Sequence, residues 1–532
     1  MKHESLASIR VIRLRQSRRS LQLLVLLLIV SMMVPVKLPA QGVAVNVNGA
    51  ASSSGNGLNG IEAFVEQVMK EWKVPGIAVA VVKDGKIEYS KGFGDRDVAL
   101  GLKVTPDTLF AIGSCSKAFT AAALAMLVEE GKLEWDKPLI DYMPDFRLYD
   151  PYATANIRPR DILTHQSGLP RHDTVWYGSP LSRRELYLRL RYLEPNKPLF
   201  SKYQYNNLMF MTAGILIERV SGMVWEDFVR TRILEPLGMK ASNFSVNDSQ
   251  KTQDYSLPYA VEKGEVKVIP FRNIDAIGPA GSINSSVNEM TQWLLLQLGK
   301  GKLGDRQIIS EKALAEVHTP QIVAGGDLKD ESFYSSYAMG WGVTSYRGHP
   351  MLAHSGGIDG FTSMVRFFPK DQLGIVVLTN SSSPASGLIA NSISDRMLGL
   401  GEVPWVQRAK DDLARSRENQ AKTRAEDEAK RKKDAPPSHQ LKDFAGTFEN
   451  SAYQTLTISL EGDQLKYDLH GLRGGLSHYH YDVFQGTEGS QGIGGTKVTF
   501  LTSKSSGEID RVAILLEPAV KEIVFTRRGV KP

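Results

Sequence analysis

The stretch LFAIGSCSKAFTAAALAMLVEE, residues 109–130, decides how the rest of this 532-residue chain is interpreted. It contains Ser114 and Lys117, and no other serine of the chain has a lysine three residues later. The residues that follow are strong helix formers, with apolar side chains at helical spacing up to Gly131. The pattern therefore predicts a helix that begins near Ser114 and places Lys117, one turn on, beside it.

This arrangement suits a nucleophilic serine. The amine can accept the serine proton, the helix N-terminus favours developing negative charge, and the Ser114 N–H can donate to an oxyanion. Taken alone, the motif is more typical of a helix cap followed by a solvated lysine, because Ser-x-x-Lys often arises by chance. Cys115, the one cysteine of the chain, points about 100° away from Ser114 on a helix. We interpret it as a small buried residue.

The first 40 residues are typical of a secretory signal peptide. An arginine-rich segment over 10–19 precedes a roughly 14-residue apolar run over 21–34, and small residues lead to Ala40 before Gln41. A bilayer span needs about 20 residues, which favours cleavage over an uncleaved anchor. Export predicts a periplasmic or secreted protein, attached to a membrane only if the signal is retained.

The same segment accounts for the charge of the chain. It carries seven Lys/Arg and one Glu, a net charge of +6. The net charge of the whole chain is also +6. The remainder is close to neutral, so the composition gives no argument for nucleic-acid binding.

Hydropathy patterns divide the rest of the chain. Residues 41–60 read as a flexible leader, and 61–402 as the main globular domain. Helices are predicted over 61–72, 208–220 and 287–298, between hairpins at 77–89 and 364–378. This order predicts an α/β (α+β) domain whose antiparallel sheet takes strands from both ends of the domain.

The C-terminal part has a different composition. Residues 403–437 form a charged linker, and 407–434 within it are either a solvated helix or a disordered tether. Short alternating segments then recur between glycine-containing turns over 438–532. They predict a small antiparallel β-barrel, here taken as lipocalin-like, with a sandwich as the alternative.

A second motif, Tyr205 followed by Asn207, precedes the predicted helix at 208–220. A phenol near a lysine ammonium can have a lowered pKa and exchange a proton with a serine or a leaving nitrogen. The asparagine can hold the lysine and a substrate amide. The alternative is a surface tyrosine followed by a helix-capping asparagine.

A third motif runs from His354 through Ser355 and Gly356 to Gly357, on a strand predicted to begin near Pro350. The Gly357 N–H could be a second oxyanion donor beside that of Ser114. His354 could orient the proton network, or contact a substrate carboxylate when protonated. The alternative is a structural histidine before a glycine turn.

Taken together, the three motifs resemble those of the serine β-lactamase-related family, which includes class C β-lactamases, penicillin-binding carboxypeptidases, D-aminopeptidases and esterases. The resemblance covers residues 60–400. Stretches that carry it include VPGIAVAVVKDGKIEYSKGFG, ILTHQSGLP, KYQYNN, GPAGSINSSVNEMTQWL, YAMGWG and HSGGIDGF. It implies a β-lactamase/penicillin-binding-protein fold with an antiparallel sheet and a helical subdomain, followed here by the barrel.

The resemblance also implies roles for the motif residues. Ser114 would be the acylated nucleophile, with Lys117 and Tyr205 as general base and acid in an order that the sequence leaves open. Substrate would be bound by Asn207, His354, Ser355, Gly356 and Gly357. His165, in ILTHQSGLP, would give structural support. No metal and no cofactor is implied.

One departure from the family pattern concerns the substrate. The third motif begins with His354, whereas class C β-lactamases have a lysine suited to a substrate carboxylate. We therefore expect an exported serine hydrolase acting on a small amide or ester, with D-amino-acid peptides, peptidoglycan-derived peptides, β-lactams and esters as candidates. The alternatives are a dedicated β-lactamase, and a penicillin-binding or sensor protein that acylates without efficient turnover. The sequence leaves the oligomeric state open.

Overall fold

The computed structural model describes residues 57–326, 331–487, 489 and 491–529. The predicted signal segment 1–40 and most of the leader 41–60 lie outside the described residues.

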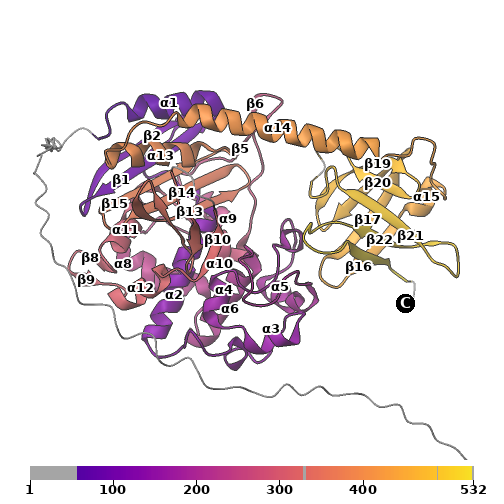
Figure 1. Ribbon diagram of the computed structural model, residues 1–532, viewed down its shortest axis with the longest axis horizontal. Coiled ribbons are helices and arrows are strands. Elements are labelled where there is room, and N and C mark those ends of the chain that lie inside the picture. Colours follow the sequence, from indigo (N-terminus) through magenta and orange to yellow (C-terminus); the bar gives the residue numbers. More distant parts are fainter. Residues whose placement is uncertain (1–56, 327–330, 488, 490, 530–532) are drawn as a thin grey trace, which may run out of the picture. The chain divides into compact units, whose positions relative to one another are not determined.

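A nine-stranded antiparallel sheet forms the centre of the main domain within the described residues (Figure 1). β1 (Gly76–Lys83) pairs with β15 (Leu373–Thr379), with Val79 opposite Val377. Strands from the two ends of the domain therefore meet in the middle of the sheet, as predicted. The order is β10 (Ile322–Gly325), β11 (Ser335–Tyr337), β12 (Gly342–Tyr346), β13 (His349–Ile358), β14 (Phe361–Phe368), β15, β1, β2 (Lys86–Asp97) and β3 (Leu102–Lys103).

Alternating side chains of β1 enter two separate hydrophobic cores. Ile77, Val79 and Val81 pack with the apolar faces of α1 (Ile61–Trp72) and α13 (Ala385–Met397). Ala78, Ala80 and Val82 face the opposite core, which contains α2 (Ser116–Glu129) and α11 (Val287–Leu298). Because both faces are covered, the strand is apolar throughout rather than alternating.

The helical subdomain is built around α2, whose residues Ser116–Leu127 are all buried. It packs against α6 (Asn207–Ser221), α10 (Gly278–Gly281) and α12 (Glu311–His318). The remaining helices are α3 (Pro151–Asn156), α4 (Pro159–Leu163), α5 (Arg183–Arg189), α7 (Trp225–Val229), α8 (Glu235–Leu237) and α9 (Val246–Ser249). Two-stranded pairs are formed by β4 (Phe110–Ala111) with β7 (Asn284–Ser285), β5 (Tyr259–Glu262) with β6 (Glu265–Val268), and β8 (Lys302–Leu303) with β9 (Arg306–Gln307).

Among the described residues, no single helix has the length and apolar character of a membrane span. Only α6 together with Trp225–Leu237 satisfies that test of length and composition, as a pair bent by 78°.

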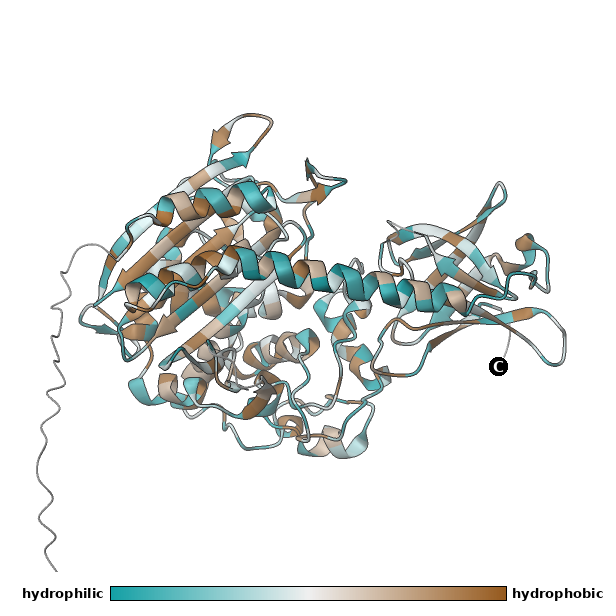
Figure 2. Cartoon of the chain, turned by 45° about the horizontal axis from the view of Figure 1, so that its top comes forward, coloured by the Kyte–Doolittle hydropathy of each residue, from teal (hydrophilic) through white to brown (hydrophobic). Residues whose placement is uncertain are grey.

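The charged segment is helical rather than disordered. α14 (Trp405–Ala429) has no buried residue, and Figure 2 shows its largely hydrophilic surface. A helix this polar owes little to packing and is supported by pairs such as Arg415 with Asp412.

The C-terminal part is a closed antiparallel barrel that follows the short helix α15 (Leu441–Phe444). Its strands are β16 (Gly446–Asn450), β17 (Gln454–Glu461), β18 (Gln464–Leu469), β19 (Leu472–His480), β20 (Val483–Gly486), β21 (Lys497–Thr502), β22 (Ile509–Ile514) and β23 (Ile523–Arg527). The predicted barrel is confirmed. The domain boundaries given above remain predictions.

Candidate active site

Ser114 lies in a single 3-10 turn, η1 (Gly113–Cys115), that leads directly into α2. Its Oγ is 3.0 Å from Nζ of Lys117. The two side chains therefore meet as the spacing predicts, although the α-helix begins two residues later, at Ser116.

Two glycines bring this turn against β13. Gly113 has φ +51°, and a Cβ added there would lie 2.7 Å from the backbone nitrogen of Gly357. A Cβ on Gly356 would lie 2.0 Å from the carbonyl oxygen of Ile112. Only glycine allows so close an approach, and the approach places Ser114 beside the end of β13.

Lys117 is fully buried, and its Nζ has three oxygen partners. They are Ser114 Oγ at 3.0 Å, Asn207 Oδ1 at 2.8 Å and the Ala280 carbonyl at 2.7 Å. Burial, assisted by the positive charge of Arg171, holds the pKa of Lys117 well below its usual value of 10.5. The Lys117 amine therefore loses its proton more readily than that of an exposed lysine.

Tyr205 lies beside this pair, with its ring centroid 4.8 Å from Lys117 Nζ. The expected lowering of its pKa is wrong. Burial raises the pKa of Tyr205 above its usual 10, and this effect outweighs the lowering by a hydrogen bond with Ser114. The phenol therefore keeps its proton at neutral pH.

His165 packs against the ring of Tyr205. Its ring is buried, and its centroid lies 4.3 Å from that of Tyr205. Its Nδ1 accepts a 3.1 Å hydrogen bond from the Asn206 N–H. Burial lowers the pKa of His165 well below 6.5, which keeps the ring neutral.

The two asparagines at the start of α6 have different hydrogen-bond partners. Asn206 caps the helix by accepting a hydrogen bond from the Met209 N–H at 3.0 Å. Asn207 is left to accept from Lys117, and its Nδ2 donates to Asp173 Oδ1 at 3.1 Å. The capping alternative for Asn207 therefore does not apply.

His354 occupies the buried face of β13 rather than the lining of the cleft. Its Nε2 accepts from the Tyr337 hydroxyl at 2.9 Å, and its Nδ1 donates to the Ser355 carbonyl at 2.6 Å. Burial lowers the pKa of His354 to about 3, so the imidazole is neutral at pH 7. The position thus offers no cation to a substrate carboxylate.

The residues after His354 alternate across the strand. Ser355 and Gly357 are exposed, whereas Gly356 is buried against the Ser114 turn. Pairing of β13 with β12 ends at Ala353, while pairing with β14 continues to Ile358. Residues 354–358 therefore present one strand edge beyond the end of β12.

Ser114, Asn207 and Gly357 line one cleft with a volume of about 640 Å³. The other walls come from residues 358–362, 382–384 and a loop at 171–177. The sequence patterns did not single out individual residues of this loop, because the loop has an ordinary composition and contains no recognisable motif. The additional lining residues on it are Arg171, Asp173, Trp176 and Tyr177.

Asp173 organises this wall. Its carboxylate accepts from Arg171 Nε at 2.6 Å, Trp176 Nε1 at 2.9 Å and Asn207 Nδ2 at 3.1 Å. Across the cleft, the Tyr177 hydroxyl donates to Asp359 at 2.6 Å, and Arg272 Nε donates to the same carboxylate at 3.0 Å. These bonds fix the side chains before any substrate arrives.

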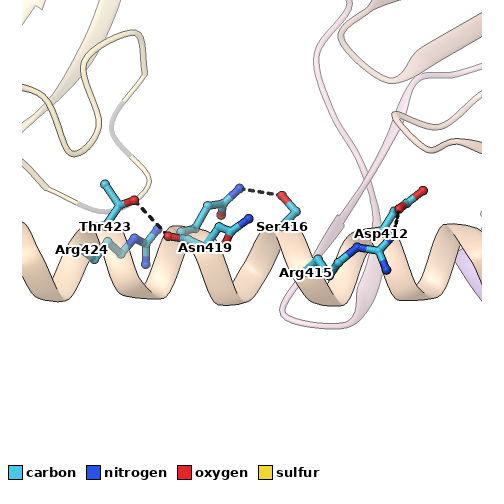
Figure 3. Close-up of a pocket in the computed structure, with 7 residues that line it drawn as sticks. Asp412, Arg415, Ser416, Asn419, Thr423 and Arg424 are labelled. Carbon is cyan, nitrogen blue, oxygen red and sulfur yellow. Dashed lines mark hydrogen bonds and ion pairs between the residues drawn. The ribbon is translucent and has the colours of Figure 1, made fainter. Parts of the chain in front are cut away.

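A metal site and a hollow beside α14 are the alternatives to this cleft. Within the described part of the chain, no group of three or more His, Cys, Asp or Glu is placed to hold a metal ion. A hollow of about 660 Å³ lies beside α14, but residues of that one helix form its whole lining (Figure 3). A single exposed helix face gives no converging groups, so the cleft at Ser114 is the candidate active site.

Comparison with known proteins agrees with this geometry. The family model described as Beta-lactamase matches residues 61–395, and a domain of unknown function (DUF3471) matches residues 430–527. A protein named unguisins hydrolase from Aspergillus campestris is 30% identical over 419 residues, covering 74% of this chain and 76% of that protein. Protein flp from Staphylococcus aureus is 26% identical over 329 residues, covering 61% and 63%.

Solved structures show the same fold. The octameric penicillin-binding protein homologue from Pyrococcus abyssi superposes with a TM-score of 0.59 at 24% identity, covering 88% of this chain and 99% of that one. A class C β-lactamase from Rhodobacter sphaeroides gives a TM-score of 0.52 at 24% identity, covering 64% and 99%. With a family model spanning most of the chain and a hydrolase among its relatives, this chain belongs to the β-lactamase family of serine hydrolases.

Proposed function

We propose that the chain is an exported hydrolase that forms an acyl-enzyme on Ser114 and releases it with water. The observation that carries the proposal is the position of Lys117. A fully buried amine with a lowered pKa lies 3.0 Å from the serine hydroxyl and is held by two further oxygens.

The geometry favours Lys117 as the base. A neutral amine has two N–H bonds, which Asn207 Oδ1 and the Ala280 carbonyl can accept, and one lone pair. That lone pair then faces the Ser114 hydroxyl. The serine proton moves to Lys117 as Oγ attacks the substrate carbonyl carbon and forms a tetrahedral intermediate.

Tyr205 suits the role of acid. Because its pKa is raised, the phenol is protonated and can donate to the leaving nitrogen or oxygen as the carbonyl–leaving group bond breaks. The proton on Lys117 then passes to the Tyr205 phenolate, which restores both groups. In the second half-reaction, water attacks the acyl carbonyl carbon and Lys117 takes a proton from the water. Lys117 passes this proton to Ser114 Oγ as the ester bond breaks, which frees the serine and the acid product.

The negative oxygen of the intermediate would be bound by two backbone N–H groups, those of Ser114 and Gly357. The contact between Gly113 and Gly357 brings these two backbone segments together at the start of α2. The positive end of the helix adds to the stabilisation.

The substrate is best described as a small amide or ester, including D-amino-acid or peptidoglycan-derived peptides and β-lactams. Since His354 is neutral and buried, the strand supplies no fixed cation for a carboxylate. This favours peptidase or esterase activity over a dedicated β-lactamase. A relative named for hydrolysing unguisins supports turnover rather than permanent acylation.

The export part of the proposal rests on the N-terminal sequence. If residues 1–40 are a cleaved signal, the protein recovered from the expressing cell begins at Gln41, in the periplasm or medium. Intact-mass measurement checks the cleavage. A mass that includes residues 1–40 would instead indicate a retained anchor.

The central test follows acylation by mass spectrometry with a fluorescent penicillin, alongside hydrolysis of nitrocefin, p-nitrophenyl esters and D-Ala p-nitroanilide. We expect a transient adduct on Ser114 with turnover of an ester or amide, abolished in Ser114→Ala. Cys115→Ala is the matched control and should keep the adduct, because Cys115 is buried and burial raises its pKa to about 12. A persistent adduct without turnover would favour the sensor alternative, and normal turnover by Ser114→Ala would refute the proposal.

A further inference from the structure

His172 lies between two residues of the active-site cleft, yet its own contacts lead elsewhere. Its neighbours Arg171 and Asp173 line the cleft. His172 itself is buried and contacts Tyr453 and Glu517, both from the C-terminal part of the chain.

Three hydrogen bonds hold this residue. The His172 N–H donates to Glu517 Oε2 at 2.8 Å, and Nε2 donates to the Glu194 carbonyl at 2.9 Å. Because Nε2 must carry the hydrogen to reach a carbonyl, Nδ1 is the acceptor for the Tyr453 hydroxyl at 2.7 Å. Burial lowers the pKa of His172, consistent with this neutral tautomer.

The backbone of His172 needs this support. Its φ of +48° is in the left-handed region, which is costly for a residue with a Cβ. Such a conformation persists only where surrounding contacts impose it. Glu517 supplies the contact on the backbone itself, and its carboxylate is also nearly completely buried.

The barrel contacts the end of the same loop. Gln454 Nε2 donates to Ser179 Oγ at 2.8 Å. A Cβ on Gly178 would lie 2.8 Å from Leu472 Cδ2, so the β18–β19 turn packs closely on this part of the loop. Both ends of segment 172–179 are thus held by residues of the barrel.

A short path links these contacts to the catalytic lysine. Asp173, next to His172, accepts from Asn207 Nδ2, and Asn207 Oδ1 accepts from Lys117. We propose that Tyr453 and Glu517 of the barrel are positioning residues for the active site. They hold His172 in its left-handed conformation and so fix Asp173 and Asn207 against Lys117. The part of this proposal that concerns acylation rests on the proposed function of Ser114.

The experiment uses the full-length chain and two matched tyrosines of the barrel. Tyr453→Phe removes the hydroxyl that binds His172 and keeps the ring. Tyr479→Phe removes the hydroxyl of another buried tyrosine, which donates instead to the Asp427 carbonyl in α14. Glu517→Ala removes the acceptor for the His172 N–H, whereas Glu517→Gln keeps an acceptor oxygen.

Two readouts are measured: the rate of Ser114 labelling by a fluorophosphonate, and amide hydrogen exchange of residues 171–177. For Tyr453→Phe we expect labelling to slow about five- to tenfold, in line with one lost hydrogen bond, and exchange to quicken. Glu517→Ala should have a larger effect, and Glu517→Gln should restore most of the rate. Tyr479→Phe should change neither readout.

Equal effects of Tyr453→Phe and Tyr479→Phe on both readouts would overturn the proposal. If Glu517→Ala fails to fold, the tyrosine pair and Glu517→Gln still decide the matter. Absence of labelling in the unmodified chain would count against the proposed function alone, because exchange of residues 171–177 still tests whether the barrel holds the loop.

Discussion

In the proposed mechanism, the protonation state of Lys117 determines the rate of acylation. Only the neutral amine can take the serine proton, so the acylation rate should rise with pH as Lys117 deprotonates. The midpoint should lie well below 10.5, because burial lowers the pKa. Stopped-flow acylation between pH 5 and 10 measures this. A rate that is independent of pH across this range would contradict the assignment of Lys117 as base.

A substitution at the same position sharpens the test. Lys117→Arg places a guanidinium, which stays protonated in proteins, where the base should be. We expect acylation to slow about 10³-fold or more. Circular dichroism serves as the folding control. Near-normal acylation in a folded Lys117→Arg variant would show that another group takes the proton.

His354 should affect stability rather than catalysis. Its pKa of about 3 in the folded chain lies below the unfolded value near 6.5, so the unfolded chain binds the proton first. The stability it contributes is complete above about pH 6.5 and is lost as the pH falls toward 3. In His354→Gln, the free energy of unfolding in urea should fall less between pH 7 and pH 5. An unchanged difference between the two pH values would show that His354 is not buried as described.

For single residues, the sequence predicted which side chains of the same segment meet. It predicted less well how burial by other segments changes their pKa values. The spacing of three residues at the start of a helix predicted that Ser114 and Lys117 meet, and they do, although Ser114 lies in the 3-10 turn before α2. The pKa of Tyr205 was predicted in the wrong direction, because its burial depends on side chains such as His165 and His354 that come from other parts of the chain. Asp173 was missed for the same reason: its role depends on Asn207, which is 34 residues away in the chain.

The Ser114 turn and β13 are in close backbone contact at Gly356. Gly356→Ala would place a Cβ 2.0 Å from the Ile112 carbonyl, so the turn must move away from Gly357. A shift of about 1 Å at reacting atoms can cost about 10²-fold in rate. We expect kcat/KM to fall by about that factor, measured with whichever p-nitrophenyl ester or D-Ala p-nitroanilide is turned over.

The matched control is Gly387→Ala, in α13, where an added Cβ meets nothing within 4 Å. It should leave kcat/KM unchanged and slightly raise the melting temperature, since alanine favours a helix over glycine. If both substitutions reduced activity equally, the loss at Gly356 could not be attributed to this backbone contact.

Elements with a strong period were predictable. The helices at 61–72 and 287–298 begin and end as the pattern indicates. The 3-10 turn before α2 was not predicted, because it depends on Gly113 adopting a positive φ against β13. Pairing partners far apart in sequence, such as β1 and β15, followed only from the order of hairpins and helices.

At the scale of the whole molecule, neither the large sheet nor the barrel contains a strand from the other. All strands of the large sheet lie within residues 76–379, and the barrel pairs only with itself in the described chain. We therefore expect a chain that ends at residue 440 to be soluble, with a changed substrate range because segment 172–179 loses its partners. Comparison of ester and D-amide hydrolysis with the full chain measures this. An insoluble product would show that both parts fold as one cooperative unit.

The sequence predicted both parts but not their contact. The barrel was visible from alternating short segments, and the catalytic domain from its motifs. The link through His172, Tyr453 and Glu517 joins residues 281 and 345 positions apart. No local pattern encodes such a pair, so these contacts could be found only in the folded chain.

Cys115 has a practical consequence that follows from where its sulfur lies. The thiol hydrogen-bonds to the His354 carbonyl at 3.2 Å and contacts Ser363 Oγ at the same distance, between the Ser114 turn and the sheet. Because this thiol is buried and is the one cysteine of the chain, a thiol reagent should reach it only when the Ser114 turn and the sheet separate. The rate at which the unmodified protein reacts with such a reagent should therefore report how often this contact opens.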